Sequence, residues 1–462
     1  MFESLGKTAI LALLVSFVNG CTQYISNDNI SKANIINATM IRIDQHSINI
    51  AIDGNGTKLS VAISPQNASN KKVVWTSENR IIADVDPNGN VIPRGIGKTT
   101  ISAATSNGIV DSTTIIVTPP LYLLGNLMVN GNIQSYMLHN NITTLLKSPY
   151  ALALSYMSTL INAINGSYIS GGIAGINKKY EPCYWLNGEI QILSKISALG
   201  DGYVYGLAFS SEIVASGATS NDAGVFYPCY WKGNVRTDLP IADNSKGGEA
   251  QGIAINNSRI LIAGLSINNY GVSIPCYWDN GIICYLNCID ITKGGEAKNI
   301  YLVNGDIYIT GLVWKKVNFY MQDGTLAYSK DIADVCYWKN GILTILQALD
   351  PNSGSTIVNG LEITNADIYV YGATGGGFAT PCYWKNGSRF DLFIDANTQY
   401  GRSGQVTGMS IFNDSIYFLG ESRPAYDSKS VACFWINNVK TDINTPINEL
   451  GYSYLTCTAY ND

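Results

Sequence analysis

A short segment, Cys-Tyr-Trp followed by a turn and a strand that ends in Leu or Ile, recurs along residues 119–462. Six copies begin at Cys183, Cys229, Cys276, Cys336, Cys382 and Cys433, and the last of them reads Cys-Phe-Trp. A seventh, degenerate copy runs from Ser135 to Leu145. Seven copies leave about 49 residues for each unit, which is the size of a four-stranded β-propeller blade.

Each copy is predicted to contain four strands. The second strand ends in a Gly before the Cys, and Asn-Gly pairs at 187–188, 280–281, 340–341 and 386–387 favour type I′ hairpins between the third and fourth strands. Within the repeated segment, side chains alternate between the two faces of a strand, so we expect Cys and Trp on one face and Tyr on the other. We interpret all three as packing between blades. The alternative is a ring of aromatic side chains that stacks on sugars.

The two ends of this region complete one unit when they are written together. Residues 458–462 followed by 121–125 reproduce the pattern of residues 363–372. We therefore expect residues 454–462 to pair into the first blade and close the ring, which removes open sheet edges. The predicted fold is all-β, with a seven-bladed β-propeller closed by the C-terminal strand. The unit resembles HAF-type extracellular repeats, in which an aromatic-rich strand with Trp-x-Asn-Gly precedes a Leu.

Residues 38–118 predict a separate β-sandwich. Short β-branched runs, such as 58–63, 73–76, 99–104 and 113–117, are bounded by Gly, Pro, Asn or Asp. The segments 64–79, 83–91 and 95–101 resemble the bacterial Ig-like group 2 family. That resemblance implies an Ig-like fold, common in surface proteins and adhesins, that often serves as a spacer. Trp75 is predicted to lie in its core.

The N-terminus predicts export with a lipid anchor. The apolar run from Thr8 to Val18 follows Lys7 and is too short to span a bilayer, so residues 1–20 are interpreted as a signal peptide. The following Cys21 resembles the lipidated Cys of a bacterial lipobox, with residues 21–37 as a polar tether. The predicted location is the cell envelope, at the outer membrane or cell surface. An ordinary secreted protein with an incidental Cys21 is the alternative.

Charge and composition narrow the classes of partner. The net charge of −5 gives no electrostatic reason to bind nucleic acid. The two histidines and the absence of a Cys-x-x-Cys pair argue against a metal site, and we expect no cofactor. The repeated cysteines are predicted to be buried free thiols. Cys276 and Cys284 should point to opposite faces of one hairpin, which excludes a disulfide between them.

An insertion in the fourth Cys-Tyr-Trp copy is the first candidate site. It covers residues 314–334 and includes Trp314, Lys315, Lys316, Phe319 and Tyr320. Aromatic side chains beside Lys favour a contact patch for a partner. The alternative, a loop folded onto its own blade, is equally compatible with the sequence.

A pair of carboxylates is the second candidate. Matching Lys-Gly-Gly-Glu-Ala segments place Glu249 and Glu296 in neighbouring copies near the predicted ring axis. Two carboxylates at one mouth could serve as acid and base in glycoside hydrolysis, although solvated loop charges are the simpler interpretation.

These observations predict a lipoprotein that displays a propeller for binding a surface protein or glycan, without catalysis. An extracytoplasmic glycan hydrolase or lyase and a purely structural envelope protein are the alternatives.

Overall fold

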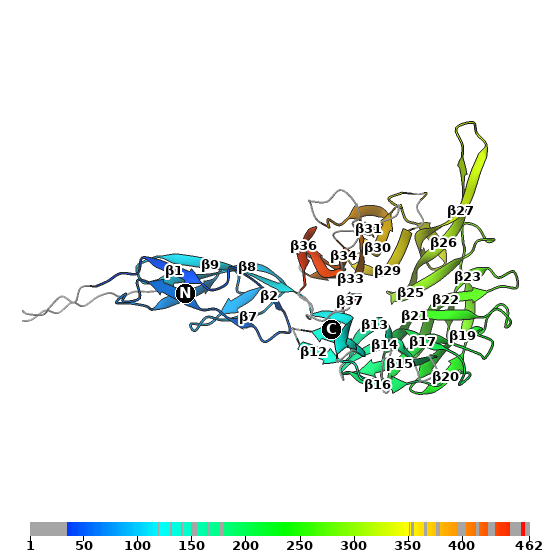
Figure 1. Ribbon diagram of the computed structural model, residues 1–462, viewed down its shortest axis with the longest axis horizontal. Coiled ribbons are helices and arrows are strands. Elements are labelled where there is room, and N and C mark those ends of the chain that lie inside the picture. Colours follow the sequence, from blue (N-terminus) through cyan, green and yellow to red (C-terminus); the bar gives the residue numbers. More distant parts are fainter. Residues whose placement is uncertain are drawn as a thin grey trace, which may run out of the picture.

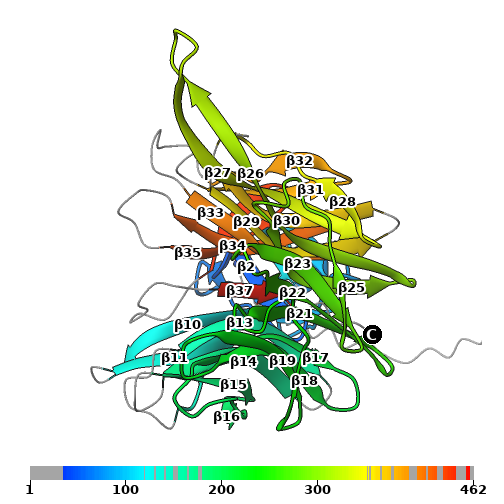
Figure 2. The same cartoon turned by 90° about the vertical axis from the view of Figure 1, so that its right-hand side faces the viewer.

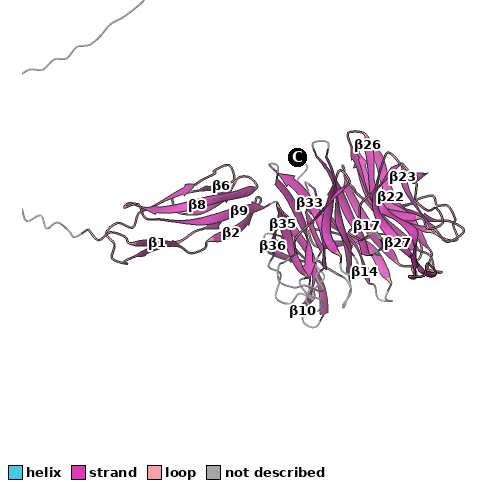
Figure 3. Ribbon diagram, turned by 90° about the horizontal axis from the view of Figure 1, so that it is seen from above, coloured by secondary structure: helices cyan, strands magenta, loops and turns pink. Residues whose placement is uncertain are grey.

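Strands are the only regular secondary structure in the described part of the chain. The computed structural model describes residues 35–118, 120–129, 132–139, 142–148, 155–163, 166–174, 179–350, 352, 355–364, 367–375, 379–394, 403–412, 415–423, 430–443 and 454–457. No helix occurs among them (Figure 3), so the all-β prediction is confirmed, and these residues contain no helix that could cross a membrane. The predicted signal peptide and Cys21 lie outside the described residues.

Residues 40–118 form a β-sandwich. Its sheets have the strand orders β1-β4, β2-β9-β8-β5 and β3-β7-β6, and β2 pairs with β9 in parallel. The bounds are β1 (Met40–Ile43), β2 (Ser47–Ala51), β3 (Thr57–Lys58), β4 (Val61–Ser64), β5 (Val73–Ser77), β6 (Ala83–Val85), β7 (Asn90–Pro93), β8 (Gly97–Thr105) and β9 (Val110–Thr118). Alternate residues of β8 and β9, such as Ile101 and Ile115, are fully buried between the sheets. Trp75 is half-buried and packs against this core.

Seven four-stranded antiparallel sheets follow in the described part of residues 121–457, and we number them in chain order. They are sheet 1, with β10 (Leu121–Val129), β11 (Asn132–His139), β12 (Ile142–Leu145) and β37 (Tyr454–Cys457); sheet 2, with β13 (Ser155–Ala163), β14 (Gly166–Ala174), β15 (Tyr180–Leu186) and β16 (Glu189–Ile192); sheet 3, with β17 (Gly202–Phe209), β18 (Ile213–Ser220), β19 (Phe226–Lys232) and β20 (Val235–Asp238); sheet 4, with β21 (Gly248–Asn256), β22 (Arg259–Ile267), β23 (Ser273–Asp279) and β24 (Ile282–Tyr285); sheet 5, with β25 (Gly295–Val303), β26 (Asp306–Tyr320), β27 (Leu326–Lys339) and β28 (Ile342–Ile345); sheet 6, with β29 (Ser355–Thr364), β30 (Asp367–Gly375), β31 (Thr380–Lys385) and β32 (Ser388–Asp391); and sheet 7, with β33 (Ser403–Phe412), β34 (Ser415–Arg423), β35 (Val431–Ile436) and β36 (Val439–Asp442).

Consecutive sheets pack face to face around a common centre (Figure 1). A separate hydrophobic cluster joins each sheet to the next, and another joins sheet 7 to sheet 1 through Leu419 and Leu123. The first strands of sheets 2 to 7 contact one another in order, and β37 of sheet 1 contacts β33. The inner strands are therefore β13, β17, β21, β25, β29, β33 and β37. The C-terminal strand β37 pairs antiparallel with β10, with Leu121 opposite Cys457 and Leu124 opposite Tyr454.

The repeated Trp side chains connect each sheet to the one before it. All six are fully buried, and each Nε1 donates a hydrogen bond of 2.6–2.9 Å to a carbonyl of the preceding sheet. The acceptor is the residue after the terminal Leu of that sheet, as in the bond from Trp338 to Asn287. The Cys of each segment shares the Trp cluster, whereas Tyr184 and Tyr230 pack against the following sheet, as predicted. These aromatic side chains therefore pack between sheets.

The repeated cysteines are buried free thiols, as predicted. Burial raises the pKa of Cys229 to about 12, so its thiol stays protonated at neutral pH. Cys276 lies opposite Tyr285 and Cys284 opposite Tyr277, which places the two sulfurs on opposite faces of their hairpin.

The Gly that ends the second-strand pattern allows close approach of the inner strand in sheets 3 to 7. A Cβ on Gly264 would lie 2.0 Å from the carbonyl oxygen of Glu249 and 2.9 Å from the Trp278 ring. Only a residue without a side chain fits between the inner strand and the Trp ring.

The degenerate first copy is offset by one residue from the sequence-based alignment. Tyr136 lies opposite Gly125, the place that Cys183 takes opposite Gly171. The buried terminal residue is Leu146, 1% exposed, and the predicted Leu145 is 45% exposed. A shift of one residue moves each side chain to the other face of its strand. The predicted Ser135–Leu145 frame was therefore wrong by one position.

Candidate functional site

A cavity of about 1090 Å³ lies among the inner strands of sheets 3 to 7. Its wall contains aromatic, charged and amide side chains; those used below are Tyr180, Tyr203, Tyr205, Phe226, Glu249, Gln251, Glu296, Lys298, Asn359 and Thr407. Binding sites for small molecules commonly have volumes of roughly 300–1,000 Å³. The cavity is therefore large enough for a sugar of more than one ring.

A β-bulge in each of these inner strands supplies one cavity-lining residue. The pairing register shifts at the same place in β17, β21, β25, β29 and β33. The residues at the bulges that line the cavity are Tyr205, Gln251, Lys298, Asn359 and Thr407. A bulge re-aims a side chain relative to its strand, and here it places five different side chains at equivalent positions around the cavity.

Four aromatic rings gather on one side of the cavity, and we call them the aromatic cluster: Tyr180, Tyr203, Tyr205 and Phe226. The Tyr203 ring is at the centre, with ring centroids 5.0 Å from Tyr180 and 5.9 Å from both Tyr205 and Phe226. All four side chains are half-buried, so ring surface remains open toward the cavity.

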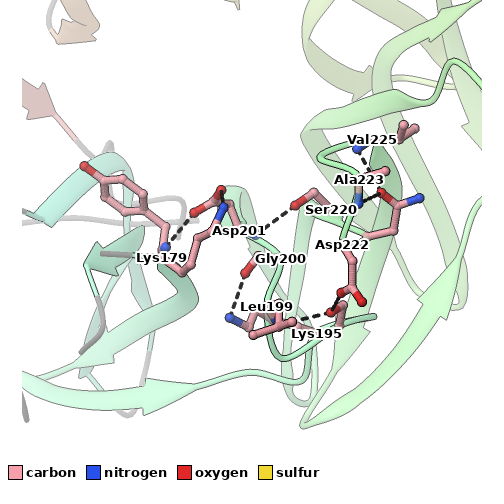
Figure 4. A network of polar contacts seen from close by, with 12 residues as sticks. Lys179, Lys195, Leu199, Gly200, Asp201, Ser220, Asp222, Ala223 and Val225 are labelled. Atoms are coloured by element: carbon pink, nitrogen blue, oxygen red, sulfur yellow. Dashed lines mark hydrogen bonds and ion pairs between the residues drawn. The ribbon is translucent and has the colours of Figure 1, made fainter. Parts of the chain in front are cut away.

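A polar network around Asp201 (Figure 4) holds the backbone next to the aromatic cluster, at Tyr180. The Asp201 carboxylate accepts a 2.8 Å hydrogen bond from the backbone N–H of Tyr180 and pairs with Lys179 at 3.1 Å. The N–H of Asp201 donates to the Ser220 hydroxyl at 2.8 Å. Because Asp201 directly precedes β17, which carries Tyr203, this network ties the start of sheet 2's third strand to the strand that carries the central ring.

The two predicted carboxylates, Glu249 and Glu296, both line the cavity, next to the starts of β21 and β25. Glu296 forms a 2.8 Å ion pair with Lys298, and Glu249 accepts a 3.2 Å hydrogen bond from Gln251. Burial and, less strongly, repulsion by Glu296 raise the pKa of Glu249, while Lys298 and the Gln251 hydrogen bond oppose the shift. These side chains are thus partly buried, in contrast to solvated loop charges.

Amide side chains fix the inner strands on the opposite side. Asn299 Nδ2 donates to the carbonyl oxygen of Asn359 at 3.1 Å, and Asn359 Nδ2 donates to that of Val406 at 2.6 Å. These bonds link sheets 5, 6 and 7 where they border the cavity. Within the described residues, no group of three or more His, Cys, Asp or Glu could hold a metal ion.

The insertion at residues 314–334 forms a β-hairpin that extends β26 and β27 beyond the rest of sheet 5 (Figures 1 and 2). It starts just after Leu312, which lines the cavity, and an ion pair of 2.8 Å between Lys293 and Asp331 fixes its base. The hairpin is neither an irregular loop nor folded onto its own sheet.

The five candidate contact residues of the hairpin do not form one patch. They follow one another along β26, so Trp314, Lys316 and Tyr320 face one side and Lys315 and Phe319 the other. Lys315 pairs with Asp334 at 2.6 Å, and the Phe319 ring stacks on Tyr328 at 4.6 Å. Trp314 is half-buried, whereas Lys316 and Tyr320 are exposed.

Sequence reasoning found the two carboxylates and missed the aromatic cluster and the bulges. A signal for the bulges was present, because Tyr205, Gln251, Asn359 and Thr407 each precede a Gly inside a strand. Gly within a strand commonly marks a bulge or a close approach of another backbone. A Cβ on Gly252 would indeed lie 2.6 Å from the carbonyl oxygen of Lys298.

The N-terminal sandwich belongs to a known family. Residues 37–117 match the model of the bacterial Ig-like domain (group 2). The Ig-like domain accounts for the three sheets of β1 to β9. An uncharacterized protein of Clostridium acetobutylicum is 37% identical over 71 residues, which are 15% of this chain and 7% of that protein. The match thus spans a small fraction of that relative.

Several solved structures resemble part of the chain at low sequence identity. A puromycin-hydrolyzing peptidase of Mycobacterium tuberculosis covers 75% of this chain and 51% of its own, with a TM-score of 0.41 and 10% identity. A polysaccharide lyase covers 70% of this chain and 88% of its own, with a TM-score of 0.39 and 10% identity. The six-bladed propeller lectin of Aleuria aurantia covers 69% of this chain and 94% of its own, with a TM-score of 0.34 and 13% identity. With TM-scores below 0.5, these likenesses are too distant to carry an argument about this chain.

Proposed function

We propose that sheets 1 to 7 form a closed seven-bladed β-propeller that binds a glycan in its axial cavity without cleaving it. Closure is supported by the pairing of β37 with β10 and by the cluster that joins sheet 7 to sheet 1. Each sheet then has two neighbours, and the cavity lies where the inner strands converge.

The observation that carries the glycan proposal is the presence of the aromatic cluster and polar side chains in one cavity. A sugar ring has an apolar C–H face, which packs on aromatic rings, and hydroxyl groups, which need hydrogen-bond partners. Tyr203 and its neighbours supply the rings. Glu249, Gln251 and Asn359 supply acceptors and donors. A cavity with a few convergent polar groups is the usual form of a small-molecule site.

Replacing the central ring tests where the glycan binds. We expect Tyr203→Ala in the full-length chain to lower the affinity for any glycan identified on an array about tenfold or more, because a buried aromatic anchor contributes roughly 2 kcal/mol. Titration calorimetry would measure the change. The matched control is Tyr320→Ala on the hairpin, which is 62% exposed and outside the cavity.

The reverse result would place the binding site on the hairpin. If Tyr320→Ala lost binding and Tyr203→Ala did not, the hairpin residues Trp314, Lys316 and Tyr320 would be the contact surface instead of the cavity.

The remaining part of the proposal concerns location. A signal peptide over residues 1–20, lipidation of Cys21 and a spacer made by the Ig-like domain would display the propeller outside the cell or at the outer membrane. The sequence of the first 21 residues supports this part of the proposal. A single acyl chain holds a protein only weakly, so stable anchoring needs more than one chain.

Hydrolysis of a glycan is the second candidate, and the raised pKa of Glu249 beside Glu296 favours it. A general acid with a raised pKa and a second carboxylate are the usual pair in glycosidases. On the binding proposal we expect the wild-type chain to release no reducing ends from a glycan that it binds. Hydrolysis by the wild type that disappears in the double variant Glu249→Gln, Glu296→Gln, with binding retained, would establish the enzyme instead.

A further inference from the structure

The lining of the cavity carries one more negative than positive side chain. The charged side chains of the lining are Glu249, Glu296 and Lys298. Lys298 pairs with Glu296 at 2.8 Å, which neutralises both. No ion pair of Glu249 occurs in the described part of the chain, and its hydrogen bond comes from the neutral amide of Gln251.

Glu249 lies next to the aromatic cluster. The strands β17 and β21 are in contact, and Tyr203 and Glu249 take equivalent positions on them. Each directly precedes the residue opposite the repeated Gly: Val204 lies opposite Gly217, and Ala250 lies opposite Gly264. The carboxylate and the central ring of the cluster therefore line the cavity at the same level.

A carboxylate beside aromatic rings discriminates between ligands by their charge. A neutral sugar that displaced water from Glu249 would leave a partly buried carboxylate with only neutral partners, the sugar hydroxyl groups and the Gln251 amide, which is costly. An ammonium group would instead form a charge-assisted hydrogen bond with the carboxylate, and it would also be attracted to the faces of the neighbouring rings. Burial raises the pKa of Glu249 even though Lys298 opposes the shift, in agreement with a carboxylate short of water.

We infer that the cavity prefers a glycan with a free, protonated amino group, an unsubstituted amino sugar, over its neutral N-acetylated form. The inference rests on the proposed glycan-binding function and adds the chemical class of the sugar.

The test compares two oligosaccharides of equal length that differ at nitrogen. Titration calorimetry of the full-length chain would use β-1,4-linked glucosamine and N-acetylglucosamine tetramers, at a pH at which the free amine is protonated. We expect the glucosamine tetramer to bind about tenfold or more tightly. Added salt should reduce the difference, since screening weakens partly exposed charge pairs.

Two variants assign the preference to Glu249. Glu249→Gln should abolish the preference, because it should lower the affinity for the glucosamine tetramer about tenfold or more and that for the N-acetylated tetramer much less. Lys298→Gln is the matched control, because it frees Glu296 and should increase the preference.

The possible outcomes separate the inference from the function on which it rests. Equal binding of the two tetramers, or tighter binding of the N-acetylated form, would overturn the inference and leave glycan binding intact. No binding of these tetramers or of any glycan on an array would overturn the proposed function as well. Binding of a lysine-rich peptide without binding of either tetramer would assign the cavity to a protein partner and would overturn both.

Discussion

A chain that ends at residue 453 is expected to lose about 2–5 kcal/mol of the stability of the seven-sheet region. The lost strand, β37, pairs with β10 at four positions from Leu121 to Leu124. A backbone hydrogen bond contributes roughly 0.5–1.5 kcal/mol net, and an unpaired buried group costs more. Strand β37 also contacts β33 and β34 of sheet 7. Its removal therefore weakens both sheets at the proposed closure and leaves β10 with an open edge.

Thermal and chemical denaturation would measure the loss. The matched control is a chain that ends at residue 457, which keeps β37 and its pairing with β10 and should therefore melt within about a degree or two of the intact chain. A peptide with the sequence of residues 454–462 should restore part of the lost stability to the shorter chain. Equal melting of all three chains would contradict the proposed closure by β37.

The sequence predicted the repeating sheets because one local pattern is repeated with strong turn signals. Asn187, Asn280, Asn340 and Asn386 have the positive φ angles, from 47° to 51°, that a type I′ hairpin requires. Once those turns are fixed, the register of each third and fourth strand follows. The alternation of side chains along the third strand then places the repeated Trp between neighbouring sheets. The copy at Ser135–Leu145, which lacks both the Cys-Tyr-Trp residues and an Asn-Gly pair, is the one whose predicted frame was wrong by a residue.

The candidate site was less accessible to sequence reasoning, since it is assembled from different residues of different copies. Glu249 and Glu296 were found because their Lys-Gly-Gly-Glu-Ala segments match. The ring at the equivalent position of sheet 3, Tyr203, has no matching segment and was missed. Repetition in the sequence marks what packs each sheet against the next, whereas the cavity residues differ from sheet to sheet because nothing in the packing constrains them.

Trp338→Ala is expected to cost about 3–5 kcal/mol, the range for a fully buried aromatic residue replaced by Ala. The Trp338 ring is fully buried with Leu261 and Leu286 of sheet 4, so the substitution leaves a cavity between two sheets. It also removes the 2.9 Å hydrogen bond to the Asn287 carbonyl. Because a domain is stable by only about 5–15 kcal/mol, such a loss brings the seven-sheet region close to unfolding.

Chemical denaturation of Trp338→Ala should show a lower midpoint, with Trp314→Ala as the control in the same sheet. Trp314 is half-buried at the base of the hairpin, so its replacement should cost about 1 kcal/mol. A third variant, Trp338→Phe, refills part of the volume without the N–H. Its loss of stability should lie between the losses of Trp338→Ala and Trp314→Ala. Equal losses for Trp338→Ala and Trp314→Ala would mean that the repeated Trp does not carry the contact between sheets. A loss for Trp338→Phe as large as for Trp338→Ala would assign that contact to the hydrogen bond instead of the buried ring.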